Sequence, residues 1–193
     1  MLSRFRSKLT PLVESLARGF IAAKIDPNVL TLMGLVAAIL CIPSAYLARG
    51  LVPVLIVLSS LLDALDGAVA RALNRVSRFG AFLDSFTDRL QEFLYLIALS
   101  ILGLDPYIAM LILAFSYLTS YLRALGELRG VKMEGHGILE RSDRAILFLI
   151  LSMLGALGMR NYMNILGFVM AILCGATVIQ RFLRVGKALR LLE

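Results

Sequence analysis

The stretch DALDGAVARALNRVSRFGAFLDSFTD, residues 63–88, places four aspartates in a chain whose other long segments are mostly apolar. Asp63 and Asp66 are three residues apart, and Asp84 and Asp88 are four apart, so each pair shares one face of a helix. A charge at membrane depth costs at least about 2.5–3.5 kcal/mol on insertion scales, so it normally faces a cavity and has a function. The four aspartates therefore mark the candidate functional site.

The composition indicates an all-α integral membrane protein. Hydrophobic residues make up 60% of the 193 residues and charged residues only 17%, and the mean hydropathy is +0.86. A soluble domain has a lower apolar share, and a membrane-spanning helix needs about 20 mostly apolar residues. The apolar segments predict six transmembrane helices, at about 29–48, 51–73, 80–103, 106–128, 143–159 and 161–185.

Residues 1–25 are predicted to form an amphipathic juxtamembrane helix at the membrane surface. Basic residues are interspersed there among apolar residues. The apolar residues recur at helical spacing and are Leu2, Phe5, Leu9, Leu12, Leu16 and Phe20. The sequence Asp26-Pro27-Asn28 should end this helix and cap the next one. Residues 26–193 then form one transmembrane domain.

The net charge of +7 would suit nucleic-acid binding, but the distribution of the basic residues argues against it. With six spans, both termini lie on the same side as the connections at 74–79 and 129–142. Of the 20 Lys and Arg residues, only Arg49 and Arg160 fall near the opposite side. The positive-inside rule therefore predicts a multi-pass cell-membrane protein with both termini in the cytoplasm and no nucleic-acid partner.

The four aspartates are expected to bind divalent metal ions. Asp66 lies about 10 Å from the cytoplasmic end of its span, and Asp88 lies about 12 Å from the same end of the next, at 1.5 Å per residue. Four carboxylates at similar depth repel one another and require protons or cations. Hard oxygen ligands suit Mg²⁺ or Mn²⁺. Two ions would balance the four charges, and two-metal centres are common in phosphoryl chemistry.

Small and polar residues near the aspartates could receive a phosphate-bearing ligand. Gly67 and Gly80 remove side chains from the helix faces beside the carboxylates, although glycine in membrane helices also serves helix packing. Arg71 can reach a phosphate group. Asn28 and Thr31 open the first span on the same side, where free N–H groups can bind an anion.

A second basic group favours an acceptor that carries its own phosphate. Four arginines near the cytoplasmic ends of later spans could converge on the aspartate cavity: Arg123, Arg141, Arg144 and Arg181. The alternative is that these arginines only follow the positive-inside rule and contact lipid headgroups.

The aspartate stretch resembles the signature of the CDP-alcohol phosphotransferases, DxxDGxxAR, eight residues, then GxxxDxxxD. All positions match here with the family's spacing: Asp63, Asp66, Gly67, Ala70, Arg71, Gly80, Asp84 and Asp88. The resemblance implies a Mg²⁺- or Mn²⁺-dependent transfer from a CDP-linked lipid to an alcohol, with release of CMP. It implies that the four aspartates hold the metals and that Asp88 is also the general base. Gly67, Arg71, Ser77 and the segment Asn28, Val29, Leu30 and Thr31 would bind the donor, and family members are usually homodimers.

Within that family, GILERSDR (137–144) and TVIQR (177–181) resemble the subgroup that uses inositol phosphate as the acceptor. These are the bacterial phosphatidylinositol phosphate synthases and the archaeal archaetidylinositol phosphate synthases. The resemblance implies CDP-diacylglycerol or CDP-archaeol as donor and places the acceptor phosphate on the arginines. Three alternatives remain: the same chemistry with glycerol 3-phosphate, a divalent-cation transporter that uses the aspartates as its ion site, and a lipid-binding scaffold in which replacing Asp88 would change only stability.

Overall fold

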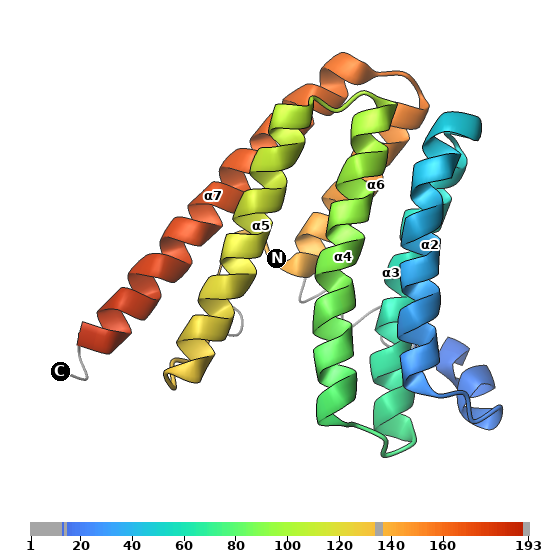
Figure 1. Ribbon diagram of the computed structural model, residues 1–193, viewed down its shortest axis with the longest axis vertical. Coiled ribbons are helices and arrows are strands. Elements are labelled where there is room, and N and C mark those ends of the chain that lie inside the picture. The colour runs from blue at the N-terminus through green and yellow to red at the C-terminus, as the bar shows by residue number, and fades with distance from the viewer. Residues whose placement is uncertain (1–12, 14, 134–136, 191–193) are drawn as a thin grey trace. The chain divides into compact units, whose positions relative to one another are not determined.

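The computed structural model describes residues 13, 15–133 and 137–190, and all their regular secondary structure is helical. Figure 1 shows the long helices, which are α2 (Pro27–Leu47), α3 (Leu51–Ala72), α4 (Arg78–Leu102), α5 (Pro106–Leu128), α6 (Arg141–Ala156) and α7 (Arg160–Arg190). The prediction of an all-α fold is confirmed. Among the described helices, α2, α3, α5 and α7 are long and apolar enough to cross a membrane.

The other two helices of the predicted six spans depart from a simple apolar segment. In α4 the charged residues Asp84, Asp88, Arg89 and Glu92 interrupt the apolar sequence. Helix α6 has only 16 residues, which is about 24 Å at 1.5 Å per residue and less than the hydrocarbon core of roughly 30 Å.

Two helices begin where an aspartate precedes a proline. The Asp26 carboxylate accepts a hydrogen bond from the Asn28 backbone N–H at 2.9 Å, and Pro27 occupies the first helical position of α2. Asp105 accepts bonds from the N–H groups of Tyr107 and Ile108 at 2.8 and 3.2 Å at the start of α5. Proline fits the first helical turn because its missing N–H would have no partner there. The predicted cap at residues 26–28 is confirmed.

The predicted ends of the last two helices are off by several residues. Helix α6 ends at Ala156 instead of 159, because the chain reverses at Gly158, whose φ is +73°. Helix α7 continues to Arg190 instead of 185. No proline interrupts this basic tail, and Lys187 and Arg190 in the last turn are favourable at the negative end of the helix dipole.

Most of the predicted amphipathic helix at 1–25 lies outside the described residues. Residues 15–22 are helical, and the Ala17 side chain is 1% exposed. It belongs to a hydrophobic cluster with Leu30 of α2 and with Leu62, Leu65 and Val69 of α3. This segment therefore packs on the start of α2 and on the half of α3 that carries Asp63 and Asp66.

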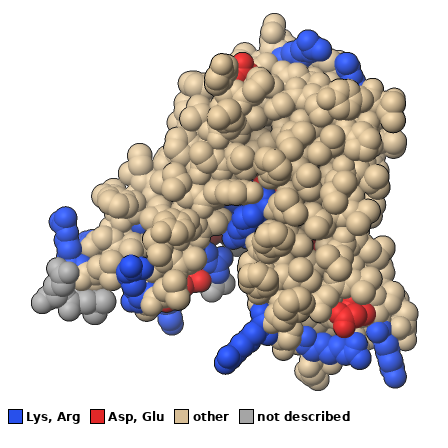
Figure 2. Space-filling model, viewed as in Figure 1, with Lys and Arg blue, Asp and Glu red and all other residues tan. Residues whose placement is uncertain are grey.

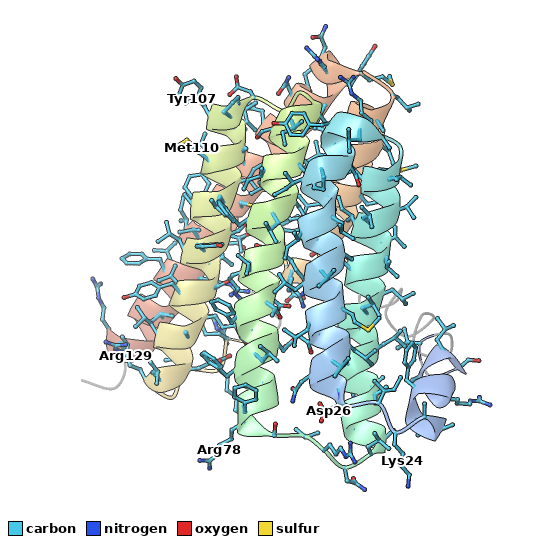
Figure 3. All side chains as sticks on the ribbon, turned by 45° about the vertical axis from the view of Figure 1, so that its right-hand side comes forward. Lys24, Asp26, Arg78, Tyr107, Met110 and Arg129 are labelled. Atoms are coloured by element: carbon cyan, nitrogen blue, oxygen red, sulfur yellow. The ribbon has the colours of Figure 1, made fainter. Side chains whose placement is uncertain are left out.

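The chain divides into two compact units. The first holds the described residues up to Ile101, and the second begins at Leu102. In the first unit, Lys24, Asp26 and Arg78 lie at one end of the α2, α3 and α4 group (Figure 3). The Ser59 hydroxyl of α3 donates to the Gly34 carbonyl of α2 at 2.7 Å, so these two helices approach closely.

In the second unit, α5 and α6 both pack on α7. Asn164 links the start of α7 to the turn before α5: its side-chain oxygen accepts from the Asp105 N–H at 2.7 Å, and its nitrogen donates to the Gly103 carbonyl at 3.2 Å. Tyr107 and Arg129 mark the opposite ends of α5 (Figure 3). Lys and Arg side chains gather mainly near the ends of the helices, while the flanks are mostly uncharged (Figure 2).

Candidate active site

Three of the four predicted metal ligands come together in the first unit. Asp63 and Asp66 of α3 and Asp84 of α4 each offer a carboxylate oxygen, and these oxygens lie within 4.8 Å of one another. The two helices are joined by the short connection 73–77, and this sets the second pair of the motif beside the first. The structure therefore brings together the two halves of the sequence motif.

Asp66 is the most enclosed of these three carboxylates, with 6% of the residue exposed. Thr31 of α2 donates a hydrogen bond from Oγ1 to Asp66 Oδ2 at 2.5 Å. A charge-assisted bond of this kind fixes the carboxylate rotamer. Thr31 is also one of the residues predicted to bind the donor, and its hydroxyl is directed at a candidate metal ligand.

Asp88 is also buried, at 5% exposure, but it is not a member of the set of three. Its Oδ2 lies 3.0 Å from Nη1 of Arg89, the next residue in the chain. One face of α4 thus carries Asp84 and Asp88 one turn apart, as the spacing predicted, but only Asp84 joins the α3 carboxylates closely.

The three clustered carboxylates fit a divalent cation by their chemistry. Carboxylate oxygens are hard ligands that suit Mg²⁺ and Mn²⁺. Three negative groups within 4.8 Å repel one another strongly at a partly enclosed site, and a cation between them removes that repulsion. Asp63, Asp66 and Asp84 therefore have the geometry to hold a metal.

Two of the predicted donor-binding residues, Asn28 and Ser77, lie on either side of Gly80 at the starts of α2 and α4. The Gly80 backbone N–H donates to Ser77 Oγ at 2.9 Å. A Cβ added at Gly80 would lie 3.1 Å from Ser77 Oγ and 3.4 Å from Asn28 Oδ1. The absence of a side chain at Gly80 thus allows Ser77 and Asn28 to lie close to this position.

The remaining donor-binding positions have different surroundings. Arg71 folds back along α3, with Nη1 3.3 Å from the Cβ position of Gly67. Leu30 is fully buried in the hydrophobic cluster with Ala17, and Val29 is 46% exposed. The segment 28–31 therefore presents its polar side chains, Asn28 and Thr31, to the site, while Leu30 anchors the helix.

The predicted acceptor-binding arginines all belong to the second unit. Arg144 of α6 and Arg181 of α7 are buried, at 4% and 7% exposure. Arg181 Nη1 donates to the Thr119 carbonyl of α5 at 2.9 Å, and Arg123 and Arg144 both act on Arg181 electrostatically. Glu140 and Glu127 act on Arg181 with the opposite sign, so this group combines three positive and two negative side chains.

The outer arginines of this group differ from the buried pair. Arg123 is exposed and pairs with Glu127 one turn along α5, at 2.8 Å between Nε and Oε1. Arg141 is half-buried at the start of α6. The loop before α6 is held on α7, because Leu139 N–H donates to Thr177 Oγ1 at 3.1 Å. This contact positions the first turn of α6, which carries Arg141 and Arg144.

Sequence reasoning missed a buried polar row on α4 beyond Asp88. Gln91, Glu92 and Tyr95 are 2%, 5% and 3% exposed. They follow Asp88 at three, four and seven residues, the spacing of one helix face. That spacing is a usable signal, because it places the three polar side chains on the face that carries Asp88.

The comparisons with known sequences agree on one family. The family pattern described as CDP-alcohol phosphatidyltransferase matches residues 24–179. The archaetidylinositol phosphate synthase of Aeropyrum pernix is 40% identical over 166 residues, covering 86% of this chain and 85% of that protein. The synthase of the same name from Pyrococcus horikoshii is 35% identical and covers 99% of this chain and 100% of that protein.

A bacterial relative and a solved structure extend the likeness. The phosphatidylinositol phosphate synthase of Cutibacterium acnes is 30% identical over 207 residues and covers 97% of this chain and 99% of its own. The crystal structure of the Mycobacterium tuberculosis phosphatidylinositol phosphate synthase with CDP-DAG bound superposes with a TM-score of 0.76. It is 23% identical and covers 91% of this chain and 94% of the other. A second crystal structure of that enzyme, with manganese and citrate, has a TM-score of 0.77 and 24% identity. It covers 90% of this chain and 88% of its own.

Proposed function

This chain belongs to the CDP-alcohol phosphatidyltransferase family, and we propose that it transfers the phosphatidyl or archaetidyl group of a CDP-linked lipid to inositol phosphate. CMP is the second product, and the reaction is a step of phospholipid biosynthesis. The observation that carries this proposal is the group of Asp63, Asp66 and Asp84 within 4.8 Å, made by residues of the family signature.

In this proposal Asp63, Asp66, Asp84 and Asp88 hold two Mg²⁺ or Mn²⁺ ions. When bound, such ions neutralise the diphosphate of the donor and the charge that develops on the leaving CMP. Thr31 fixes the orientation of Asp66 through its 2.5 Å hydrogen bond. The short α3–α4 connection keeps the two aspartate pairs at one level.

Asp88 is the proposed general base. It accepts the proton of the acceptor hydroxyl as that oxygen attacks the lipid-side phosphorus, and the bond from this phosphorus to the CMP oxygen breaks. Its burial, at 5% exposure, limits access of water, which would otherwise hydrolyse the donor. A carboxylate beside cations is ionised at neutral pH, so close positioning is the main requirement.

The donor lies across the ends of α2, α3 and α4 in this proposal. Asn28 and Ser77, which meet beside Gly80, bind the nucleotide, and Arg71 contacts its phosphates past Gly67. The segment Asn28, Val29, Leu30 and Thr31 forms the start of this donor surface. CDP-diacylglycerol and CDP-archaeol share the cytidine diphosphate group that these residues would contact, and two of the relatives above are named for the archaeal lipid.

Inositol phosphate is proposed to bind through the arginines of the second unit. Arg144 and Arg181 are buried, Arg123 acts electrostatically on Arg181, and Arg141 lies three residues before Arg144 in the first turn of α6. A group of arginines of this kind suits a phosphate. The named activities of the archaeal and bacterial relatives support this acceptor. Glycerol 3-phosphate also carries a phosphate, and it is the second acceptor to test.

We further propose six membrane spans with both termini in the cytoplasm, an amphipathic helix within 1–25 on the membrane surface, and a homodimer. Helix α4 is counted as a span although it carries charged residues, because Asp88 and Glu92 are buried in the protein and face the site. Helix α6, with 16 residues, would span by local thinning or by protein contacts at its ends.

The test is CMP release by purified protein with a CDP-lipid and Mg²⁺. Release with inositol phosphate, and not with glycerol 3-phosphate, serine or free inositol, is the expected result. Release with glycerol 3-phosphate alone would keep the chemistry and change the acceptor. If folded protein releases no CMP with any acceptor, the transferase proposal fails, and Mn²⁺ uptake into vesicles becomes the test of a cation transporter.

A further inference from the structure

A buried layer of three residues lies one helical turn further into the first unit than the aspartates. Gly34 of α2 is three residues after Thr31, Ser59 of α3 is four before Asp63, and Gln91 of α4 is three after Asp88. A Cβ added at Gly34 would lie 3.3 Å from Gln91 Nε2 and 3.3 Å from the Ser59 carbonyl oxygen. The three helices therefore converge at this level, and the absence of a side chain at Gly34 makes room for the Gln91 amide.

The Gln91 amide nitrogen is buried but donates no hydrogen bond to the described residues around it. The residue is 2% exposed, and within the described part of the chain Nε2 has no hydrogen-bond partner. Ser59 next to it directs its own hydroxyl to the Gly34 carbonyl at 2.7 Å. Burying two N–H donors without acceptors costs folding free energy, so such a group in a native protein calls for a ligand.

The position of Gln91 on α4 points to that ligand. Side chains on a helix tend to lean toward its N-terminus, and the turn of α4 on that side of Gln91 carries Asp88 on the same face. Asp63 and Asp88 each have a carboxylate oxygen that is shielded from solvent. An amide nitrogen only donates hydrogen bonds and an ionised carboxylate only accepts them, so the two groups are chemically complementary.

The same structure contains an example of such support at a neighbouring carboxylate. Thr31 donates to Asp66 from α2 at 2.5 Å. Metal-binding carboxylates are usually held by hydrogen bonds of this kind, and loss of one typically weakens metal binding about 10- to 100-fold. Asp66 receives its support from α2, and Gln91 is placed to supply support from α4.

We propose that Gln91 is a positioning residue for the metal centre. Its Nε2 donates to an oxygen in the ligand shell of a bound divalent ion, on the membrane-interior side of the carboxylates. This oxygen belongs to a ligand carboxylate or to a metal-bound water. The inference rests on the proposed metal site, but it does not depend on which lipid or which alcohol the enzyme uses.

The test is Mn²⁺ binding to the purified full-length protein in detergent, followed by the electron paramagnetic resonance signal of free Mn²⁺ without substrates. Gln91→Leu keeps the volume and removes both donors, and the dissociation constant for Mn²⁺ should rise about 10- to 100-fold. The metal-free melting temperature should stay the same or rise, because a buried amide without acceptors has been replaced by an apolar group. Ser152→Ala is the matched control: it removes another buried polar group, whose hydroxyl donates within α6, and it should leave Mn²⁺ binding unchanged.

Gly34→Ala provides a second variant that keeps Gln91. The added methyl would lie 3.3 Å from Nε2 and displace the amide by a few tenths of an ångström. Mn²⁺ binding should weaken in the same direction, by less than in Gln91→Leu. A Gln91→Leu protein that binds Mn²⁺ within twofold of the wild type would overturn the inference, and so would unchanged binding in Gly34→Ala if the first variant cannot be purified. Wild-type protein that binds Mn²⁺ but releases no CMP would overturn the proposed function and leave this inference standing.

Discussion

Thr31 and Asp66 are 35 residues apart in the chain and are joined by a 2.5 Å hydrogen bond between the first turns of α2 and the aspartate end of α3. Thr31 is 3% exposed and Asp66 is 6% exposed, so this bond is shielded from water. It connects the segment that was assigned to the lipid donor with the group assigned to the metal. The orientation of one metal ligand therefore depends on how α2 packs against α3.

Replacing Thr31 by Val tests this connection. The two side chains have nearly the same shape, so the packing of α2 is kept. The variant loses the hydroxyl, which lies 2.5 Å from Asp66 Oδ2 and 3.2 Å from the Pro27 carbonyl oxygen. The Mn²⁺ concentration needed for half-maximal CMP release should rise about 10- to 100-fold. Thr31→Ser retains the hydroxyl and should stay close to the wild type. Equal metal dependence in the Val and wild-type proteins would show that the bond has no role in holding the metal.

The Thr31–Asp66 bond also shows where sequence reasoning ended. The spacing within 63–88 was enough to predict the association of Asp63, Asp66 and Asp84, because two helices with a short connection leave few arrangements. The helix starts at Asp26-Pro27 and Asp105-Pro106 can also be predicted from the sequence, since the capping signals are local. A bond between helices depends on rotation about their axes, and no local pattern gives that rotation.

Asp88 illustrates the same limit within one helix. Its place one turn after Asp84 predicted a fourth member of the cluster, and its burial agrees with a functional role. Its rotamer, however, is directed toward Arg89, with 3.0 Å between Oδ2 and Nη1. Periodicity determines which face a residue occupies, but the rotamer depends on neighbouring charges and on any bound ion.

Gly80→Ala should weaken donor binding selectively. The new methyl would lie 3.1 Å from Ser77 Oγ and 3.4 Å from Asn28 Oδ1, so these two side chains must separate. The KM for the CDP-lipid should rise several-fold while kcat changes little, because the carboxylates are not touched. Gly50→Ala is the control, since a Cβ there meets nothing within 4 Å. An unchanged KM for the donor in Gly80→Ala would remove Asn28 and Ser77 from the proposed donor site.

Gly137→Ala should loosen the loop that leads into α6. Gly137 has a φ of +139°, and an added Cβ would lie 2.6 Å from Thr177 Cγ2. The loop must move off α7 and lose the bond from Leu139 N–H to Thr177, so stability should fall by about 1–3 kcal/mol. The KM for inositol phosphate should rise as well, because Arg141 and Arg144 follow this loop. Both quantities can be measured by thermal unfolding and by CMP release.

Gly158→Ala separates backbone strain from the steric clash. Gly158 also has a positive φ, +73°, but a Cβ there meets nothing within 4 Å. This variant should lose about 1 kcal/mol from strain and keep the wild-type KM for inositol phosphate. If both glycine variants raise this KM equally, the loop contact with Thr177 does not position the arginines.

Arg144→Ala should affect the acceptor and spare the donor. A charge-assisted hydrogen bond contributes about 1.5–3 kcal/mol, which corresponds to a rise of about 10- to 150-fold in the KM for inositol phosphate. The KM for the CDP-lipid should stay within about twofold of the wild type. Arg184→Ala is the matched control, because Arg184 is an exposed arginine on α7 with a long contact, 3.4 Å, to the Lys132 carbonyl. Equal KM values for inositol phosphate in the Arg144→Ala and wild-type proteins would contradict acceptor binding by Arg144. They would favour the alternative that these arginines contact lipid headgroups.

Asp88→Asn should reduce turnover while leaving donor binding largely intact. The amide has the shape of the carboxylate and an oxygen that can still approach a metal, but it cannot accept the proton of the acceptor hydroxyl. Loss of a general base lowers kcat by about 10²- to 10⁴-fold. Stabilisation of the protein by CMP with Mn²⁺, measured as a shift in melting temperature, should persist because the three clustered carboxylates remain.

Glu127→Gln, which removes an exposed acid paired with Arg123, controls for a change of charge and should keep kcat. Turnover by Asp88→Asn within tenfold of the wild type would exclude Asp88 as the base, and loss of the CMP-dependent shift would assign it chiefly to metal binding.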